Sequence, residues 1–257
     1  MLERHIRSTP RGEPVSVTAV AAEPVVARGI ARVASVAVLL AELIVFVDRP
    51  LAHYCRQHAN AIHDAIATVS TLGEGGWYLV PSLLVFMIAR FIVRRPAIAA
   101  RGLFVFLGVA LAGLAADILK VLIGRSRPWV LFWEGAYDFW PLQLNADYQS
   151  FPSGHAACAA AAALTLAVIA PRYRVQLLLA GLLVALTRVV IVAHYLSDVV
   201  AGAALAWLVV LTVQRAFARH GVLLGPAGGA GLGMLPSPLA QRVLDLRPNQ
   251  MTTANVR

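Results

Sequence analysis

The sequence predicts an all-α, polytopic membrane protein with six transmembrane helices. Of its 257 residues, 59% are hydrophobic and 14% are charged, and the mean hydropathy is +0.73. A soluble domain has about 25% charged residues and about 45–50% apolar residues. The chain also contains six apolar stretches of roughly the 17–25 residues that a helix needs to cross a bilayer. Together these observations exclude an ordinary soluble fold.

The predicted spans follow one another along the chain. They cover residues 29–47, 77–93, 98–123, 155–170, 175–194 and 198–217. The first span follows a polar segment and has no small-residue cleavage site behind a short apolar core, so we interpret it as an uncleaved anchor. The fourth span is short and begins at the turn Pro152-Ser153-Gly154-His155, and its run of alanines suits close helix packing.

The predicted domain organisation has three parts. Residues 1–28 form a disordered cytoplasmic tail, residues 29–217 form the six-span domain, and residues 218–257 form a flexible cytoplasmic tail. The glycine-rich stretch after the sixth span is typical of a linker. The two cysteines, Cys55 and Cys158, lie in different parts of this arrangement. We therefore expect neither a disulfide nor a thiolate metal site.

The net charge of +9 is best explained by membrane topology, because all but six of the 22 basic residues fall at one set of span ends and in the tails. The six exceptions are Arg49, Arg56, Lys120, Arg125, Arg127 and Arg188. Since basic residues accumulate on the cytoplasmic side, both termini are predicted to be cytoplasmic, and nucleic-acid binding is not expected. The alanine and arginine bias indicates a bacterial genome, which would place the opposite face in the periplasm.

Three of the six outward cations approach one membrane face. Lys120 is the only lysine in the chain, and Arg127 follows it by seven residues, just before Pro128 ends the helical pattern. Arg188 precedes His194 by six residues on the fifth span, which places it about 9 Å deeper along the helix. Charge within a membrane span is costly and usually faces a polar cavity or a partner.

The start of the fourth span meets these cations at the same face. Ser153 and Gly154 form the N-terminus of that helix, and a helix N-terminus flanked by lysine and arginine favours an anion such as phosphate. His155 and His194 add chemistry, because one can act as a nucleophile and the other as an acid. Asp198, four residues after His194, can hold its imidazole in one tautomer.

This spacing resembles the three-part signature of the type 2 phosphatidic acid phosphatase (PAP2) superfamily. The parts are Lys120-x6-Arg127-Pro128, Pro152-Ser153-Gly154-His155 and Arg188-x5-His194-x3-Asp198. Thr187 stands where the family usually has serine, and a hydroxyl group is retained. The match runs from residue 120 to residue 198, and the six-span layout extends it to most of the chain. Three motifs in order are far more specific than one short motif.

The resemblance implies a PAP2-like helical core of the membrane-bound lipid phosphatase branch and a role for each motif residue. His194 would attack phosphorus to form a phosphohistidine, Asp198 would orient it, and His155 would protonate the leaving oxygen. The phosphoryl oxygens would be bound by Lys120, Arg127, Arg188, Ser153 and the N–H of Gly154. No metal or other cofactor would be needed, because the cations supply the charge stabilisation.

The sequence therefore predicts a lipid phosphate or diphosphate phosphatase of the bacterial inner membrane, with its active site at the periplasmic face. The expected partner is a membrane lipid, and undecaprenyl diphosphate is favoured over phosphatidylglycerophosphate, phosphatidate and lipid A phosphates. The alternatives are a lipid phosphotransferase with the same residues and a non-catalytic transporter or scaffold on the same frame. A vanadium-dependent peroxidase shares the anion site but is soluble. No oligomeric state is predicted.

Some neighbouring residues stay open between functional and structural roles. Arg125 is placed equally well at the rim of the substrate site and in a solvated loop. Asp117 lies three residues before Lys120 and is expected to make a structural polar contact with it. The aromatic residues of the segment 129–151 are expected to form an interfacial belt, and some of them could line the entry of the lipid.

Overall fold

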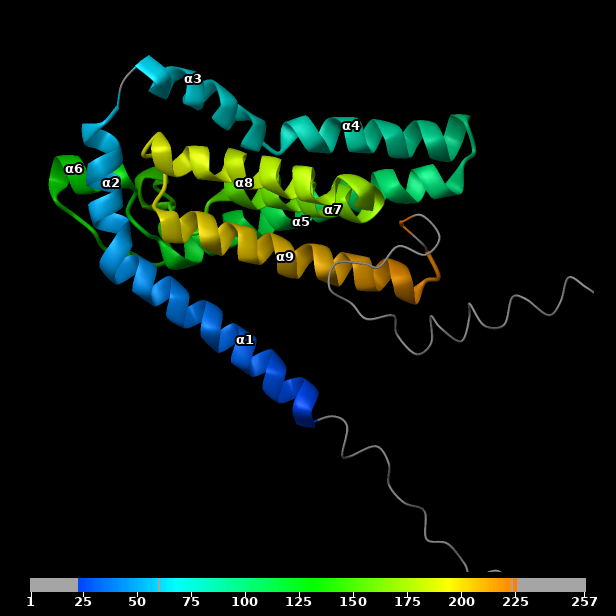
Figure 1. The fold of residues 1–257 in the computed structure, drawn as a ribbon, viewed down its shortest axis with the longest axis horizontal. Helices are drawn as coiled ribbons and strands as arrows, with labels where there is room; N and C mark the ends of the chain where they lie inside the picture. Colours follow the sequence, from blue (N-terminus) through cyan, green and yellow to red (C-terminus); the bar gives the residue numbers. More distant parts are fainter. Residues whose placement is uncertain (1–22, 60, 223, 226–257) are drawn as a thin grey trace, which may run out of the picture. The chain divides into compact units, whose positions relative to one another are not determined.

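The computed structural model describes residues 23–59, 61–222 and 224–225, and these residues form helices and no named strand (Figure 1). The all-α prediction is confirmed for this part of the chain. The chain divides after Glu42 into two compact units. Most of the two predicted tails, residues 1–22 and 226–257, lies outside the described residues.

The described part of the first unit is one helix, α1 (Glu23–Glu42). The predicted end of the N-terminal tail, at residue 28, falls inside this helix. The second unit contains all the motif residues and the remaining helices. These are η1 (Leu43–Val47), α2 (Asp48–Gln57), α3 (Ala61–Ser70), η2 (Thr71–Gly73), α4 (Gly76–Met87), η3 (Ile88–Ile92), α5 (Pro96–Ile123), α6 (Pro128–Glu134), η4 (Ala146–Tyr148), α7 (Gly154–Ile169), η5 (Pro171–Tyr173), α8 (Arg174–Val190) and α9 (Leu196–Arg219).

Within the described residues, four helical segments are long and apolar enough to cross a membrane. They are His63–Ile92, Pro96–Ile123, Pro171–Val190 and Leu196–Arg219. The helix α7 is apolar but shorter, with 16 residues. The structure thus confirms a helical chain with several membrane-long segments, whereas the count of six spans stays a prediction. The second predicted span is longer than expected, because α3 continues through η2 into α4.

The helix α7 forms the centre of the second unit, where it packs against α5, α8 and α9. Small side chains make this close packing possible. A Cβ on Gly181 would lie 2.5 Å from the Cβ of Ala163, and one on Gly108 would lie 2.6 Å from Thr165. Most alanines of α7 are buried. The prediction that the alanine run serves close helix packing is therefore confirmed.

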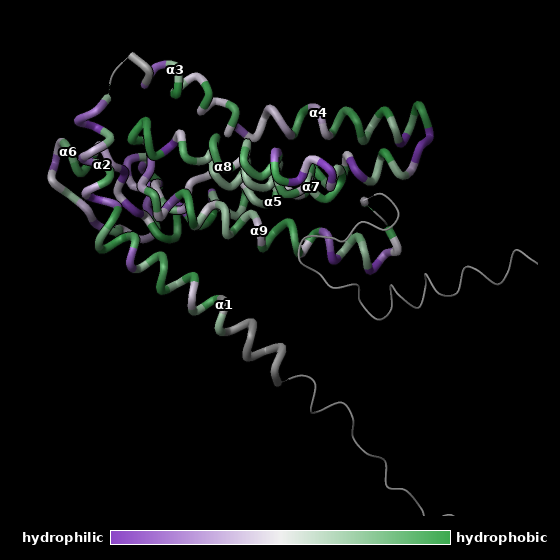
Figure 2. The backbone as a smooth tube through the Cα atoms, viewed as in Figure 1, coloured by the Kyte–Doolittle hydropathy of each residue, from purple (hydrophilic) through white to green (hydrophobic). Residues whose placement is uncertain are grey.

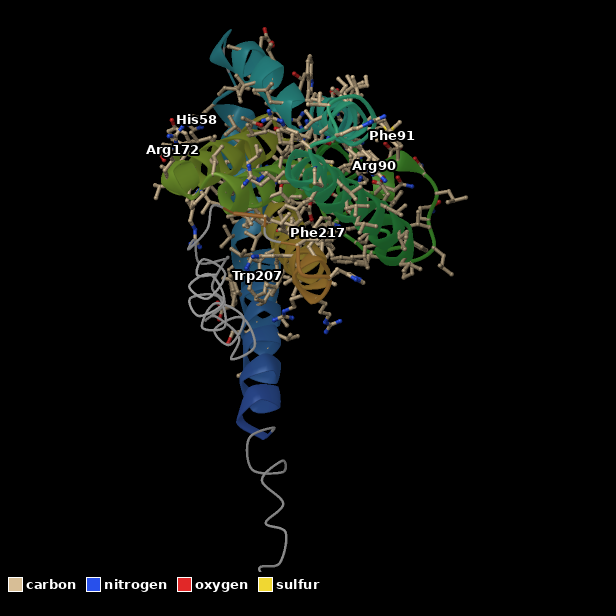
Figure 3. All side chains as sticks on the ribbon, turned by 90° about the vertical axis from the view of Figure 1, so that its right-hand side faces the viewer. His58, Arg90, Phe91, Arg172, Trp207 and Phe217 are labelled. Carbon is tan, nitrogen blue, oxygen red and sulfur yellow. The ribbon has the colours of Figure 1, made fainter. Side chains whose placement is uncertain are left out.

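Polar residues concentrate at the two ends of this bundle, and Figure 2 shows long hydrophobic stretches along α4 and α9 between them. At one end, η3 joins α5 and η5 joins α8. Figure 3 looks at the bundle from this end, where Arg90 and Arg172 are labelled; each guanidinium lies over the ring of the next residue, at 5.4 and 4.5 Å. At the other end, α5 and α8 finish and α7 and α9 begin, which brings the three motifs together.

Glycine ends α5 at the motif end of the bundle. Gly124 has a φ of +62°, and its N–H donates to the carbonyl of Lys120 at 2.9 Å. A Cβ at this position would lie 1.6 Å from the carbonyl oxygen of Trp140. Only glycine satisfies both the left-handed backbone and the close approach. The loop after α6 can therefore fold back onto the end of α5.

Candidate active site

The N-terminus of α7 is built by the Pro-Ser-Gly-His turn. Ser153 is the N-cap residue, because its Oγ accepts a hydrogen bond from the N–H of Ala156 at 3.4 Å. Its own N–H donates to the carbonyl of Asp198 at 3.0 Å. A Cβ on Gly202 would lie 2.5 Å from the Ser153 carbonyl oxygen, so glycine lets α9 approach the cap. The turn is both a helix cap and a direct neighbour of Asp198.

His194 was predicted to lie on the fifth span, and this is wrong, because α8 ends at Val190 and His194 lies in the short connection between α8 and α9. Its N–H donates to the carbonyl of Arg188 at 3.1 Å, and Val192 in the same connection has a φ of +56°. A β-branched residue rarely adopts this left-handed conformation, and such strained residues cluster at functional sites. The tight connection places the His194 side chain in the interior, where the residue is 3% exposed.

Asp198, in the first turn of α9, faces His194. Its Oδ2 lies 3.6 Å from Nδ1 of His194, a long separation of the kind that tightens in enzymes when substrate binds. Ser150 lies between the two groups: its Oγ donates to Oδ2 of Asp198 at 2.6 Å and lies 3.4 Å from Nδ1 of His194. Since Nδ1 faces the carboxylate, Nε2 is the nitrogen available for attack.

The environment of His194 keeps its imidazole neutral. Burial lowers the pKa of His194 to about 4, because removal from water disfavours the imidazolium. The hydrogen bond and charge of Asp198 oppose this lowering, whereas the charges of Arg127 and Arg188 add to it. At neutral pH the ring therefore has a free lone pair on one nitrogen, as nucleophilic attack requires.

If His194 is the nucleophile, as the family resemblance implies, the acid limb of the pH profile of kcat/KM is expected near a pH of about 4, since the lowered pKa keeps His194 neutral until the pH falls to that value. A histidine in water would lose its nucleophilic form at a pH of about 6.5. Initial rates should be corrected for the second ionisation of a phosphate monoester, which lies at a pH of about 6. A corrected limb centred near the value for free histidine would contradict the buried, neutral His194.

The three predicted cations gather around His155 at the start of α7. The guanidinium groups of Arg188 and Arg127 and the ammonium group of Lys120 lie close enough to the His155 imidazole to affect its ionisation. A Cβ on Gly154 would lie 2.9 Å from Nζ of Lys120, so the lysine lies directly over the helix N-terminus. Within the described chain, the buried Nε atoms of Arg127 and Arg188 have no hydrogen-bond partner. The structure thus brings the predicted phosphate ligands into one cluster.

Two of these cations are held by neighbouring side chains. Nη1 of Arg188 donates to Oγ of Ser70 at 2.9 Å. Nζ of Lys120 donates to Oδ1 of Asp117 at 2.8 Å, which confirms the expected contact one turn apart on α5. Ser70 was not predicted, because it precedes the second predicted span. Both contacts hold long, flexible side chains near the start of α7, which would lower the entropy cost if an anion binds there.

The corner between α3 and α4 forms one wall of the site. A Cβ on Gly73 would lie 3.0 Å from the Cβ of His155, so glycine lets the corner pack directly against this histidine. The sequence signal is the run Gly73-Glu74-Gly75-Gly76. The sequence analysis did not predict that this corner lines the site, because a glycine-rich stretch before an apolar span is typical of an ordinary loop.

Arg125 lies neither at the rim of the site nor in a solvated loop, so both expectations for it are wrong. Its side chain is 1% exposed. Nη1 donates to Oδ1 of Asp198 at 2.5 Å, and Nη2 donates to Oδ2 of Asp48 at 2.8 Å. Although burial opposes the effect, the carboxylates of Asp198 and Asp48 raise the pKa of Arg125 above its usual value. The physical reason for its position is that a buried charge requires a partner, and two carboxylates lie here.

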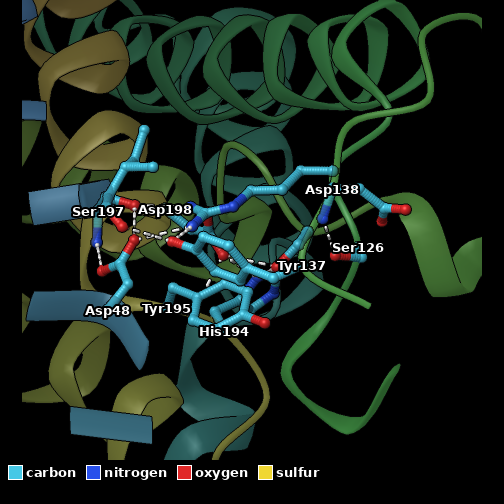
Figure 4. A network of polar contacts seen from close by, with 11 residues as sticks. Asp48, Ser126, Tyr137, Asp138, His194, Tyr195, Ser197 and Asp198 are labelled. Carbon is cyan, nitrogen blue, oxygen red and sulfur yellow. Dashed lines mark hydrogen bonds and ion pairs between the residues drawn. The ribbon is translucent and has the colours of Figure 1, made fainter. Parts of the chain in front are cut away.

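Arg125 bonds four residues that are labelled in Figure 4, namely Asp48, Tyr137, Ser197 and Asp198. Oη of Tyr137 accepts a hydrogen bond from Nη2 of Arg125 at 2.6 Å and donates to the carbonyl of Ile44 at 2.7 Å. Burial raises the pKa of Tyr137 to about 12, so the phenol keeps the proton that it donates. Oγ of Ser197 accepts from Nη1 of Arg125 at 2.6 Å. The network joins η1, α2, the segment after α5 and the start of α9.

The aromatic residues after Pro128 fall into two groups. Trp133 and Trp140 are 77% and 57% exposed, as expected for a belt at a membrane surface. Trp129 is partly buried, and its Nε1 donates to Oδ1 of Asp147 at 3.0 Å. Tyr137 belongs to the Arg125 network. A role of this segment in lipid entry stays a prediction.

A family model and several known proteins match this chain. The family model of the PAP2 superfamily matches residues 101–221. A lipid A 1-phosphatase of Rhizobium johnstonii is 35% identical over 184 residues, which cover 66% of this chain and 72% of that protein. A lipid A 1-phosphatase of Rhizobium etli is 33% identical over 195 residues, covering 71% and 81%. The chain belongs to the PAP2 superfamily.

Two solved structures share the PAP2 fold of this chain. The crystal structure of Aquifex aeolicus LpxE matches with a TM-score of 0.50 and 20% identity, over 66% of this chain and 95% of that one. A transmembrane PAP2-type phosphatidylglycerolphosphate phosphatase from Bacillus subtilis matches with a TM-score of 0.52 and 20% identity, over 72% and 96%. The family model and the two Rhizobium relatives confirm the predicted membership of the membrane-bound lipid phosphatase branch.

The PAP2 match contains every motif residue from Lys120 to Asp198 but begins after α2 and α3. Sequence reasoning missed Asp48 and Ser70, which lie outside the match, and Ser150 and Ser197, which lie within it. For Asp48 a signal exists, because it is an acid directly after an apolar stretch, where a charge needs a partner. For the three serines the sequence contains no comparable signal.

Proposed function

We propose that this PAP2 membrane phosphatase removes phosphate from the head group of a lipid, without a metal ion, through a phosphohistidine on His194. The single observation that supports this most strongly is the arrangement around His194. A buried, neutral imidazole faces Asp198 with Nδ1 and lies among Arg127, Arg188 and the start of α7. A nucleophile, an orienting acid and cations for a phosphoryl group are the parts that phosphoryl transfer requires.

The first step of the proposed reaction forms the phosphoenzyme. Nε2 of His194 attacks phosphorus with its lone pair while the bond from phosphorus to the lipid oxygen breaks. His155 donates a proton to that oxygen, and the lipid leaves as an alcohol or, from a diphosphate, as a monophosphate. Asp198 stabilises the positive charge that the ring of His194 acquires.

The second step returns the enzyme to its starting state. His155, now neutral, accepts a proton from water, and the water oxygen attacks the phosphohistidine. The bond from phosphorus to Nε2 breaks, and inorganic phosphate leaves. Three cations, the hydroxyl of Ser153 and the N–H of Gly154 bind the equatorial oxygens, most strongly in the five-coordinate transition state. The cations are Lys120, Arg127 and Arg188.

We propose lipid A 1-phosphate as the first substrate to test, because the two relatives with 35% and 33% identity are named for that activity. Undecaprenyl diphosphate, which the sequence favoured, is the second. Both lipids present a phosphate at the membrane surface and keep their chains in the bilayer. The site would therefore open at the periplasmic face, as the distribution of basic residues predicts. Labelling from the outside of a cysteine placed after Pro128 tests this orientation.

Phosphate release in detergent with EDTA, from a panel of lipid A, undecaprenyl diphosphate, phosphatidylglycerophosphate and phosphatidate, tests the function. We expect release that survives the chelator and is inhibited by vanadate, which mimics five-coordinate phosphorus. Strict dependence on added Mg²⁺ would contradict the mechanism. Transfer of the phosphoryl group to a second lipid, without free phosphate, would identify a phosphotransferase.

A further inference from the structure

The buried network behind His194 contains one cation and two carboxylates. Arg125 is 1% exposed, and the side chains of Asp48 and Asp198 are fully buried. The guanidinium bonds one carboxylate with each of its two terminal nitrogens. With neutral His194 the cluster therefore keeps one net negative charge. Removing such charges from water is costly, so the second carboxylate calls for an explanation.

Asp48 is also bonded to the start of α9, the helix that carries Asp198. Its Oδ1 accepts the N–H of Ser197 at 3.0 Å, and its Oδ2 accepts the hydroxyl of Ser197. Ser197 directly precedes Asp198 in the chain. Asp48 thus fixes the backbone next to Asp198 and at the same time shares the guanidinium that Asp198 contacts. It links the first residue of α2 to the residue that faces the nucleophile.

The charge balance suggests what Asp48 contributes. Arg125 alone with Asp198 would form a neutral pair, and Asp198 would offer little net charge to a positive ring. With Asp48 also on the guanidinium, a net negative charge is left opposite Nδ1 of His194. Positive charge develops on that ring when Nε2 bonds phosphorus. Low-polarity surroundings strengthen this electrostatic effect.

We propose that Asp48 is a positioning residue of the active site, which orients Asp198 through Arg125 and Ser197 and leaves its carboxylate free to stabilise charge on His194. This inference rests on the proposed function. It assigns a catalytic contribution to α2, which lies outside the residues 101–221 matched by the family model. Residues that hold a ligating or catalytic side chain in place often change activity by about 10–100-fold when replaced.

The test is Asp48→Asn, which keeps the shape of the side chain but removes its charge. The one amide oxygen can still accept the two bonds that Oδ2 accepts from Arg125 and Ser197, whereas the bond from the N–H of Ser197 to Oδ1 is lost. We expect kcat to fall by about 10–100-fold while KM changes by less than about threefold, because ground-state binding is untouched. The matched control is Asp138→Asn, since within the described residues this carboxylate accepts a hydrogen bond only from Trp140 and makes no bond with Arg125. An unchanged kcat in Asp48→Asn, with the control also unchanged, would overturn the inference.

A second readout does not depend on catalysis. In the vanadate-bound protein, proton NMR should show a downfield Nδ1–H resonance for the hydrogen bond from His194 to Asp198, assigned by its loss in His194→Ala. We expect the resonance to move upfield in Asp48→Asn and to stay in place in Asp138→Asn. A lower kcat with an unmoved resonance would mean that Asp48 is only structural, which would overturn the inference.

Two further outcomes are distinguishable. If the wild-type protein releases no phosphate from any lipid but the resonance responds to Asp48→Asn, the proposed function fails and the positioning role stands. If Asp48→Asn does not fold, Ser197→Ala removes the bridging hydroxyl and leaves both charges in place. That variant should shift the resonance in the same direction, and no shift would overturn the inference.

Discussion

Replacing His194 with alanine is expected to lower phosphate release by at least about 10⁴-fold, because removal of a nucleophile leaves only the contributions of the remaining site. The lipid substrate should still bind, since the cations that would hold the phosphoryl group do not depend on this ring. Trapping of a phosphorylated enzyme that is labile in acid and stable in alkali, as phosphohistidine is, should succeed with the wild type and fail with the variant.

His58→Ala is the matched control for this experiment. His58 is an exposed histidine at the end of α2, where its ring stacks on Tyr54 with centroids 4.1 Å apart. The side-chain contacts of His58 among the described residues are with Tyr54 and not with a motif residue, so its loss should leave the rate near that of the wild type. Retention of activity in His194→Ala, with a folded protein, would exclude His194 as the nucleophile and would favour attack by a water molecule.

Replacing Arg125 with alanine is expected to destabilise the protein by about 3–5 kcal/mol, because it leaves two buried carboxylates without a cation. Asp48 and Asp198 both lie in the interior and both bond the guanidinium. Tyr137 and Ser197 would also lose the donor that they accept from. Thermal unfolding in detergent should show a large drop in the midpoint, together with loss of activity.

Arg49→Ala is the comparison for this variant. Arg49 is an exposed residue of α2, and its guanidinium lies 5.5 Å from the ring centroid of Tyr137. An exposed cation–π contact contributes about 0.5–1 kcal/mol, so a small shift of the midpoint is expected. Equal effects of the two replacements would show that the ion pairs of Arg125 contribute little to the stability of the folded protein.

The helices and the composition of the site were predictable because they depend on local pattern. Apolar stretches of sufficient length predicted α5 and α9 to within two residues of their ends, whereas α8 ends at Val190, four residues before the predicted end at residue 194. Ser153 before an alanine run predicted a capped helix, and the structure shows that cap. Successive spans cross the membrane in opposite directions. Counting them therefore predicted that the cations lie at the same face as the start of α7. In each case the information lies in residues close together in the chain.

The count of membrane spans was less predictable from the same pattern. Composition alone did not show that α3 would continue through η2 into α4, because the glycine-rich corner resembles a loop. The corner contacts His155 only after the chain has folded, with Gly73 against its side chain. A contact between residues about eighty positions apart leaves no periodic signal in either segment.

The sequence by itself determined the membrane class, the helical core and the set of residues from Lys120 to Asp198 that face one end of the bundle. Only the tertiary structure decided the burial and the ion pairs of Arg125 and Asp48. Arg125 lies 77 residues from Asp48 and 73 from Asp198, and no local pattern distinguishes a buried arginine from a solvated one. The physical reason is that a charge enters the interior only where folding supplies partners, and partners from α2 and α9 meet only in three dimensions.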